Sequence, residues 1–361
     1  MEISNDVPLA PMTTMGVGGL ARHFVKAVTV EDLRAAIHWA RSRAMPFVVL
    51  GGGSNVIVED SGFPGLVVQP ALRGRRLDSP ASASVEVTAS AGESWDDLVA
   101  FAVGNDLQGI ECLSGIPGSV GAAPLQNVGA YGQEVGDVLA SVEVLDTHED
   151  VVRHLEHDEC RLGYRSSRFK SADAGRFVVL AVRLRLARCG TPTVRYDELA
   201  RRLVRAGTPS PSLAQVRHCV LDLRERKGMV WDPAKREPRS VGSFFVNPTL
   251  AQGDLQALEE RAHQRGLLGR QDRVPAFKMP DGRSKVPAAW LIEGAGYHRG
   301  HTRERVGLSP QHALAIVARD AATALDVLSF AQEIETAVLD AFGLQLVREA
   351  VTLGAATTRV A

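Results

Sequence analysis

The feature that most constrains the fold of this chain is a short apolar run that ends in three glycines. Residues 47–50 (Phe-Val-Val-Leu) lead directly into Gly51-Gly52-Gly53, which is typical of a buried strand followed by a sharp loop. Residues 31–44 before the run have the apolar spacing of an amphipathic helix, and Val67-Val68 begins another short strand pattern. This order predicts a β-α-β start, a small α/β unit of roughly 70 residues.

The rest of the chain mixes strand and helix patterns, which predicts an α+β protein with several domains. At 361 residues it is longer than one hydrophobic core usually serves, so we expect two or three. Strands are predicted at 85–89, 141–146, 177–186 and 313–317, helices from Ser94 onward and at 212–226, 250–266 and 321–341, and an extended stretch at 346–353.

Composition argues against several classes of protein. The net charge is −1 with histidine neutral, so the chain as a whole does not favour nucleic acid or a membrane surface. The N-terminus lacks the basic and apolar segments of a signal peptide, and the apolar runs are too short to span a bilayer. Cys112, Cys160, Cys189 and Cys219 are scattered, as buried thiols in a reducing compartment are. We expect a cytoplasmic protein without a metal site.

Three glycine-rich loops indicate a ligand that carries phosphate. In Gly51 to Asn55, successive glycines expose backbone N–H groups, which suit phosphate oxygens. The loop matches neither a P-loop nor the Gly-x-Gly-x-x-Gly pattern, and taken alone a glycine triplet is more often a flexible turn. Residues 114–122 and 126–132 form further loops of small residues. Together the loops favour one long, phosphate-bearing cofactor lying across them.

A serine stands in another conspicuous segment, residues 240–248. Gly242 gives the backbone freedom to turn, Ser243 follows at once, and two phenylalanines and Asn247 complete the segment. Such a serine could be a nucleophile, a proton donor or a turn residue. The Gly-x-Ser-x-Gly pattern of an esterase is absent around it, which weakens the nucleophile and disfavours a hydrolase.

Two charged clusters and one lone acid remain ambiguous on their own. Arg165, within residues 163–170, has the planar guanidinium that suits a carboxylate or phosphate, but by itself this cluster is typical of a solvated surface. Residues 224–227, with Tyr196 upstream, could meet a diphosphate or form an exposed helix end. Glu349 usually would be an exposed strand residue; buried beside a cofactor, its pKa would rise and it could donate a proton or a hydrogen bond.

Taken in order, these segments resemble the UDP-N-acetylenolpyruvoylglucosamine reductase family, flavoenzymes of peptidoglycan precursor synthesis. The resemblance runs nearly from end to end, although Arg348 stands where the family commonly has proline. Any one segment is weak, whereas eight in the family's order argue against chance. The eight are Thr13 to Gly19, Gly51 to Asn55, Ser114 to Gly132, Gly163 to Lys170, Lys227, Gly242 to Pro248, Ala289 to Ile292, and Glu349.

The resemblance implies a fold of three domains that binds FAD in the manner of vanillyl-alcohol-oxidase/PCMH-like flavoproteins. Residues 1–72, joined by 343–361, and residues 73–226 would carry FAD, and residues 227–342 would form a C-terminal substrate-binding domain. The residues implied to hold FAD are Gly51, Gly52, Gly53, Ser54, Asn55, Ser114, Gly115, Ile116, Pro117, Gly118, Ser119, Gly121, Asn127, Gly129, Ala130, Tyr131 and Arg224.

The resemblance also implies a reaction. NADPH would reduce FAD, and a hydride would then pass from flavin N5 to C3 of UDP-N-acetylglucosamine enolpyruvate. Ser243 would give a proton to C2, and Arg165 and Glu349 would stabilise the developing charge. The substrate-binding residues implied are Tyr164, Tyr196, Lys227, Asn247 and Lys285, with Tyr196 placing the chain in a subgroup that closes a tyrosine-bearing loop.

Two other functions remain open at this point. One is a flavin-dependent oxidase of the same cofactor fold with another substrate, and the other is a non-catalytic flavin- or nucleotide-binding protein. Ser243, Arg165 and Glu349 are all present, which argues against the non-catalytic alternative. We expect a monomer with no nucleic-acid or membrane partner.

Overall fold

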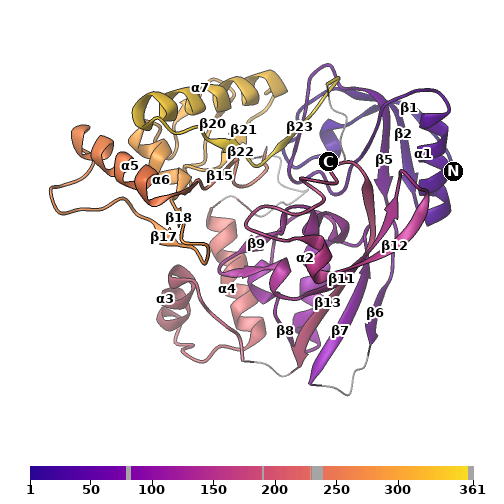
Figure 1. Ribbon diagram of the computed structural model, residues 1–361, viewed down its shortest axis with the longest axis horizontal. Helices are drawn as coiled ribbons and strands as arrows, with labels where there is room; N and C mark the ends of the chain where they lie inside the picture. The colour runs from indigo at the N-terminus through magenta and orange to yellow at the C-terminus, as the bar shows by residue number, and fades with distance from the viewer. Residues whose placement is uncertain (79–82, 189–190, 228, 230–238, 357–361) are drawn as a thin grey trace.

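The structure is a computed structural model that describes residues 1–78, 83–188, 191–227, 229 and 239–356. Figure 1 shows three groups of elements: an N-terminal sheet with one helix, a long antiparallel sheet in the middle of the sequence, and a C-terminal group of helices on the opposite side. Within the described residues no helix is both long and apolar enough to cross a membrane.

The N-terminal sheet has the strand order β1-β2-β5-β3, formed by Ser4–Pro8, Leu20–Ala27, Phe63–Pro70 and Phe47–Val49. Helix α1, Val30–Arg41, begins at Thr29, whose side chain accepts a hydrogen bond from Asp32 N. Strands β2 and β3 both run parallel to β5, so the predicted β-α-β start is confirmed. The strand that contains Val67-Val68 begins earlier than expected, at Phe63.

The second sheet is antiparallel, with the order β12-β11-β13-β7-β6 and β8 pairing with β13. Its strands are β6 Arg75–Asp78, β7 Ser84–Ser90, β8 Leu107–Gln108, β11 Leu139–Asp146, β12 Val151–Glu156 and β13 Phe177–Arg188. Helix α2, Trp95–Gly104, begins at Ser94 as predicted, because the Ser94 hydroxyl accepts from Asp97 N (3.3 Å). Leu145 and Val178 of this sheet pack with α1 in one apolar cluster.

Helices α3, Asp197–Arg205, and α4, Leu213–Arg226, follow the second sheet. The prediction of α4 is confirmed, and a capping box at Ser212 fixes its start. Short elements connect the rest: β9 Gly129–Ala130, β10 Gln133–Glu134, and the 3-10 helices Ala10–Met12, Glu111–Leu113, Val120–Gln126, Val135–Asp137 and His157–Cys160.

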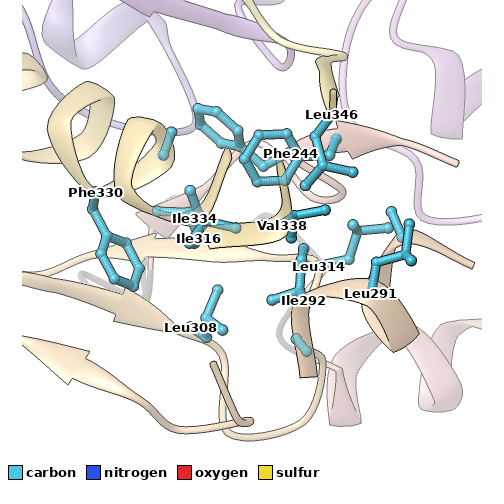
Figure 2. Close-up of a cluster of buried hydrophobic side chains, with 14 of the residues drawn as sticks. Phe244, Leu291, Ile292, Leu308, Leu314, Ile316, Phe330, Ile334, Val338 and Leu346 are labelled. Carbon is cyan, nitrogen blue, oxygen red and sulfur yellow. The ribbon is translucent and has the colours of Figure 1, made fainter. Parts of the chain in front are cut away.

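The C-terminal group packs helices on a small sheet of order β14-β21-β20-β19. These strands are Arg239–Ser240, Ile316–Ala318, Val306–Leu308 and Thr302–Arg303, and the helices are α5 Gln252–Gln264, α6 Ala288–Gly294 and α7 Ala324–Phe342. A second sheet joins β16 Thr249–Leu250, β18 Ser284–Lys285 and β17 Phe277–Lys278. Figure 2 shows the core between α7 and the sheet, where Phe244, Ile316 and Phe330 are fully buried.

The predicted strand at 313–317 begins only at Ile316. The preceding residues form a turn instead, because Ala315 N bonds to His312 O (3.2 Å) and Ser309 N bonds to Ala315 O (2.8 Å). Among the cysteines, Cys112, Cys160 and Cys219 are free and buried, while Cys189 lies outside the described residues.

The last strands tie the C-terminal group to the N-terminal one. Strand β22, Val347–Arg348, pairs antiparallel with β15, Phe245–Val246. Strand β23, Val351–Leu353, then pairs parallel with β4, Val56–Val58, directly after the first glycine loop. The predicted extended C-terminal stretch is confirmed, and Glu349 lies between its two strands.

Candidate active site

A cleft of about 870 Å³, open solvent included, lies between the two glycine loops. Gly51 to Asn55 form one wall, and Ile116 to Ser119 form the facing wall. Trp95 and Phe169 add aromatic surface, and Trp95 Nε1 donates to Leu113 O (3.2 Å), which fixes the ring. A mostly apolar cleft with polar loop backbone at one side suits a long cofactor that has a ring system and phosphates.

The glycines of the two loops are needed because backbones touch. A Cβ on Gly52 would lie 2.6 Å from Gly118 Cα, and a Cβ on Gly51 would lie 2.7 Å from Ser119 Oγ. Gly53 and Gly118 also have φ angles of +61° and +119°, which L side chains rarely adopt. The loops therefore form a cradle that side chains would fill, and its shape fits an FAD-like cofactor.

Arg224 braces the second loop from behind. Its Nε donates to Gly115 O (3.1 Å) and its guanidinium also donates to Met229 O (2.9 Å). Burial lowers the pKa of Arg224. Asp96 holds the same loop by accepting from Gly115 N (2.6 Å). Arg224 is not among the residues that line the cleft. In this structure it positions Gly115 through its hydrogen bond to the Gly115 carbonyl.

Glu349 is a buried acid beside the first loop. Its Oε1 lies 3.0 Å from Arg165 Nε and accepts from Gln126 Nε2 at 3.3 Å. Asn55 Nδ2 donates both to Gln126 Oε1 and to the backbone oxygen of Glu349, each at 3.0 Å. Burial raises the pKa of Glu349, and the positive charges of Arg165 and Lys170 oppose the rise. A carboxyl in this position can hold a proton at higher pH than an ordinary glutamate.

Arg165 stands at the tip of a tight turn. Gly163 and Ser166 exchange two backbone hydrogen bonds (3.0 and 3.1 Å), which leaves Tyr164 and Arg165 as the two turn residues. Arg165 has a φ of +50°, a conformation that costs a residue other than glycine about 1–3 kcal/mol and clusters at functional sites. Its guanidinium also donates to Gly129 O (3.0 Å), so the turn is held against the loop of residues 126–132.

Ser243 is brought next to Glu349 by strand pairing. Glu349 N donates to Phe244 O (2.8 Å), and Phe244 N donates to Leu314 O (2.8 Å). The rings of Phe244 and Phe245 are fully buried and lie edge to face, 5.2 Å between centroids. Ser243 itself is partly exposed. The two buried rings therefore anchor Ser243, which directly precedes Phe244, the residue whose carbonyl accepts from Glu349 N.

The chain matches two family models that together cover most of its length. Residues 21–154 match an FAD binding domain, and residues 232–353 match the UDP-N-acetylenolpyruvoylglucosamine reductase, C-terminal domain. A protein of Saccharopolyspora erythraea named UDP-N-acetylenolpyruvoylglucosamine reductase is 45% identical, with 96% of this chain and 95% of that protein covered. The chain belongs to the UDP-N-acetylenolpyruvoylglucosamine reductase family.

Further relatives agree with this membership. A protein of the same name from Mycolicibacterium smegmatis is 41% identical, with 98% of this chain and 96% of that protein covered. The crystal structure of a UDP-N-acetylenolpyruvylglucosamine reductase from Thermus caldophilus superimposes with a TM-score of 0.65 at 25% identity, covering 98% of this chain and 99% of that one. The predicted α+β fold, with an FAD-binding part and the C-terminal domain of this reductase family, is confirmed.

The structure sorts the residues predicted to hold FAD into two groups. Those that line the cleft are Gly51, Gly52, Gly53, Ser54, Asn55, Ile116, Pro117, Gly118 and Ser119. Ser114, Gly115, Gly121, Asn127, Gly129, Ala130, Tyr131 and Arg224 are not among its lining residues. Asn127, for example, donates to Glu134 (2.7 Å) and to Gly163 O (3.1 Å) and accepts from Gly136 N (2.7 Å), so its side chain holds loops together. The binding roles of both groups stay predictions.

The residues predicted to bind the substrate also fall into two clusters. In one, the Lys285 amine lies 4.7 Å from the centre of the Tyr164 ring, and Asn247 interacts with Tyr164. In the other, Tyr196 meets Tyr131 edge to face at 5.4 Å, and Lys227 Nζ lies 5.6 Å from the Tyr131 ring. Each cluster offers a cation beside an aromatic ring.

Lys227 also forms a 2.6 Å ion pair with Glu198. The sequence analysis did not predict a role for Glu198. Arg348, the departure from the family's usual proline, pairs with the buried Glu335 of α7 at 2.6 Å. This pair secures β22 one residue before Glu349. Sequence reasoning also passed over Gln126 and Lys170 as individual site residues. Both lay within motifs already noted, and only the fold shows that they face the same cleft.

Proposed function

We propose that this protein reduces UDP-N-acetylglucosamine enolpyruvate to UDP-N-acetylmuramate, with NADPH as reductant and FAD as cofactor, in peptidoglycan precursor synthesis. The observation that carries the proposal is the pair between buried Glu349 and partly exposed Arg165 beside the cleft, with Ser243 one residue before Phe244, whose carbonyl accepts from Glu349 N. The family membership supports the same substrate and reductant. Protonation of a carbanion requires a proton donor, and an acid and a cation can stabilise the charge that develops.

The chemistry that bound FAD supplies is hydride transfer, taken from NADPH and delivered to C3 of the enolpyruvyl group. Hydride addition at C3 leaves an electron pair at C2 that spreads into the substrate carboxylate. Arg165, fixed at its turn by Gly129 O, places a positive charge for that carboxylate. Glu349, whose pKa burial raises, donates a hydrogen bond when protonated. Both groups are oriented before the reaction, so they need not reorganise during it.

The Ser243 hydroxyl donates the proton that completes the reaction at C2. A free serine is a weak acid, so the transfer requires a strongly basic carbanion and a site with little water. The buried Phe244 and Phe245 rings provide the apolar backing for this position. Ser243 and Glu349 approach from paired segments of backbone, which keeps donor and acid in register.

The nucleotide portion of the substrate is proposed to meet the two cation–aromatic clusters. Lys227 and Lys285 provide positive charge for the diphosphate, and Tyr164 and Tyr196 provide ring surface and hydroxyls. Tyr196 is 43% exposed, so it is free to close over a ligand. Asn247 accepts from Ala288 N (2.8 Å) and thereby fixes the end of the Ser243 segment.

We also propose the three-part division, with residues 1–72 plus 343–361, 73–226 and 227–342 as domains. One apolar cluster consists of buried side chains from residues 85–186. A second draws mainly on residues 241–342, with Met15, Val17 and Ile57 added from the N-terminal part. This sharing supports domains that pack closely on one another.

A stopped-flow experiment tests the function in two half-reactions without oxygen. NADPH should bleach the flavin absorbance of the purified holoprotein, and UDP-N-acetylglucosamine enolpyruvate should then restore it. UDP-N-acetylglucosamine, which lacks the double bond, is the control and should restore nothing. A colourless protein without flavin fluorescence, or a reduced flavin that the substrate leaves bleached, would contradict the proposal.

A further inference from the structure

The cleft has a single charged residue among those that line it, Lys170. The other lining residues are glycines, small polar residues, apolar residues and aromatics. The proposed mechanism uses Ser243, Arg165 and Glu349 but gives Lys170 no part. A lone cation in a cleft shaped for an anionic cofactor calls for a specific role.

Among the residues that the structure describes, the cations around Lys170 are paired with carboxylates, whereas Lys170 has no ion pair. Arg165 pairs with Glu349 at 3.0 Å, and Arg168 pairs with Asp173 at 2.7 Å. Within the described residues, the Lys170 amine has no ion pair at 4 Å or less. Its charge is therefore available to a ligand in the cleft.

The backbone around Lys170 holds the side chain at the cleft wall. Lys170 N donates to Ser167 Oγ (3.3 Å), and the Ser167 hydroxyl donates to Leu125 O (2.5 Å). Phe169 is buried and meets Phe177 edge to face at 6.2 Å. The buried Phe169 ring and the hydrogen bonds of Ser167 together fix the position of the Lys170 backbone, from which its exposed side chain extends.

Lys170 belongs to the reacting end of the cleft. Partial desolvation lowers the pKa of its amine, the negative charge of Glu349 opposes that shift, and Arg165 adds to it. The geometry agrees, because Lys170 is tied through Ser167 to Leu125, and the next residue, Gln126, lines the same cleft and donates to Glu349 Oε1 (3.3 Å). The contact between the two glycine loops, at Gly52 and Gly118, is the part of the cleft suited to phosphates.

We propose that Lys170 sets the reduction potential of the bound flavin by stabilising the charge that reduction adds. This inference rests on the proposed function, because it requires FAD in this cleft. A hydride brings two electrons and one proton, so the flavin ring gains one negative charge. A cation close to that charge favours the reduced cofactor over the oxidised one. Lys170 is thus a tuning residue for the flavin, and its charge, rather than its shape, is the property that matters.

The test compares midpoint potentials of purified holoprotein, measured by equilibration with a reference dye. Lys170→Gln should lower the preference for reduced over oxidised FAD by about 10-fold, which is about 30 mV for a two-electron couple. Lys170→Arg keeps the charge and should keep the wild-type potential. Arg161→Gln is the matched control, because it removes one positive charge from an exposed residue of the same region that does not line the cleft.

Two results would overturn the inference. One is an unchanged potential in Lys170→Gln with weaker binding of oxidised FAD, which would assign Lys170 to the cofactor's phosphates. The other is an equal shift of the midpoint potential in Arg161→Gln, which would show that the shift follows from the net charge of the protein and not from the position of Lys170. The measurement needs only flavin and dye, so a wild-type protein that holds FAD but fails to reduce the enolpyruvyl substrate would refute the proposed function and leave this test intact.

Discussion

Replacing Gly53 with alanine tests whether the first loop holds FAD through close packing of backbone. Gly53 has a φ of +61°, and a Cβ there would lie 2.9 Å from Thr13 Cα and nearer still to the carbonyl oxygen of Met12. Thr14 N donates to Gly53 O (3.1 Å), so the two segments are already tied together. Backbone atoms cannot rotate out of the way as a side chain can, and the loop must move.

The size of the effect follows from two terms. A left-handed backbone conformation costs a residue other than glycine about 1–3 kcal/mol, and overpacking adds about 1–3 kcal/mol. A loop that relieves the contact by shifting disturbs the cleft wall, so we expect the loss to divide between folding stability and FAD affinity. A share of about 2.7 kcal/mol in binding corresponds to a roughly 100-fold higher Kd for FAD.

Quenching of FAD fluorescence on titration with apoprotein measures the affinity, and urea denaturation of the same apoprotein measures the stability. Gly253→Ala is the matched control, because Gly253 lies in α5 and a Cβ there meets nothing within 4 Å. It should leave the Kd for FAD unchanged. Wild-type affinity together with wild-type stability in Gly53→Ala would refute the reasoning.

Three further predictions concern the acid, the serine and the core. Ser243→Ala should keep flavin reduction by NADPH near normal and slow substrate reduction by about 10²–10⁴-fold, measured by stopped flow; an equal loss in both half-reactions would contradict its role as proton donor. Burial raises the pKa of Glu349 above its ordinary value of 4.5, so the folded protein binds this proton more tightly than the unfolded chain does. The free energy of unfolding therefore falls as the pH rises from about 4.5 through the pKa of the folded state. Glu349→Gln removes this loss, so its Tm relative to wild type should increase with pH, and a constant difference would count against the shift. Phe244→Ala should cost about 3–5 kcal/mol in urea denaturation, whereas Phe277→Ala, at a ring that is 60% exposed, should change stability by less than about 0.5 kcal/mol; similar losses would be inconsistent with the core shown in Figure 2.

Elements with strong local signals could be predicted from sequence. Helix α1 has an apolar stripe and a threonine cap, and α2 and α4 begin at serine caps. Helix α3 was not predicted: it has only 9 residues and buries only Leu199 and Leu203, although these two have helical spacing. Strand β2 mixes buried and exposed positions without a regular alternation, so its place in the sheet comes from β1 and β5 on either side.

The site was predictable to the level of segments but not of contacts. Glycine content indicates a loop that must approach something closely, and this led to both walls of the cleft. Residue type does not say which way a side chain points, and Asn127 and Arg224 turn out to brace loops. The hydrogen bond from Asn55 to the backbone of Glu349 joins residues 294 positions apart, a separation that no local pattern can reveal.

The pairing of β23 with β4 has a consequence for how the protein folds. Val351 pairs with Val56, so 351 − 56 = 295 residues separate the partners. Closing a loop of this length costs chain entropy before the contact gives any return, and such long-range pairings form slowly. In the N-terminal sheet and in the antiparallel sheet, which flank the glycine loops, the paired strands lie closer together in the sequence. We therefore expect a folding chain to form the glycine-loop walls of the cofactor cleft first and to gain Val351, which also lines the cleft, together with the buried acid last.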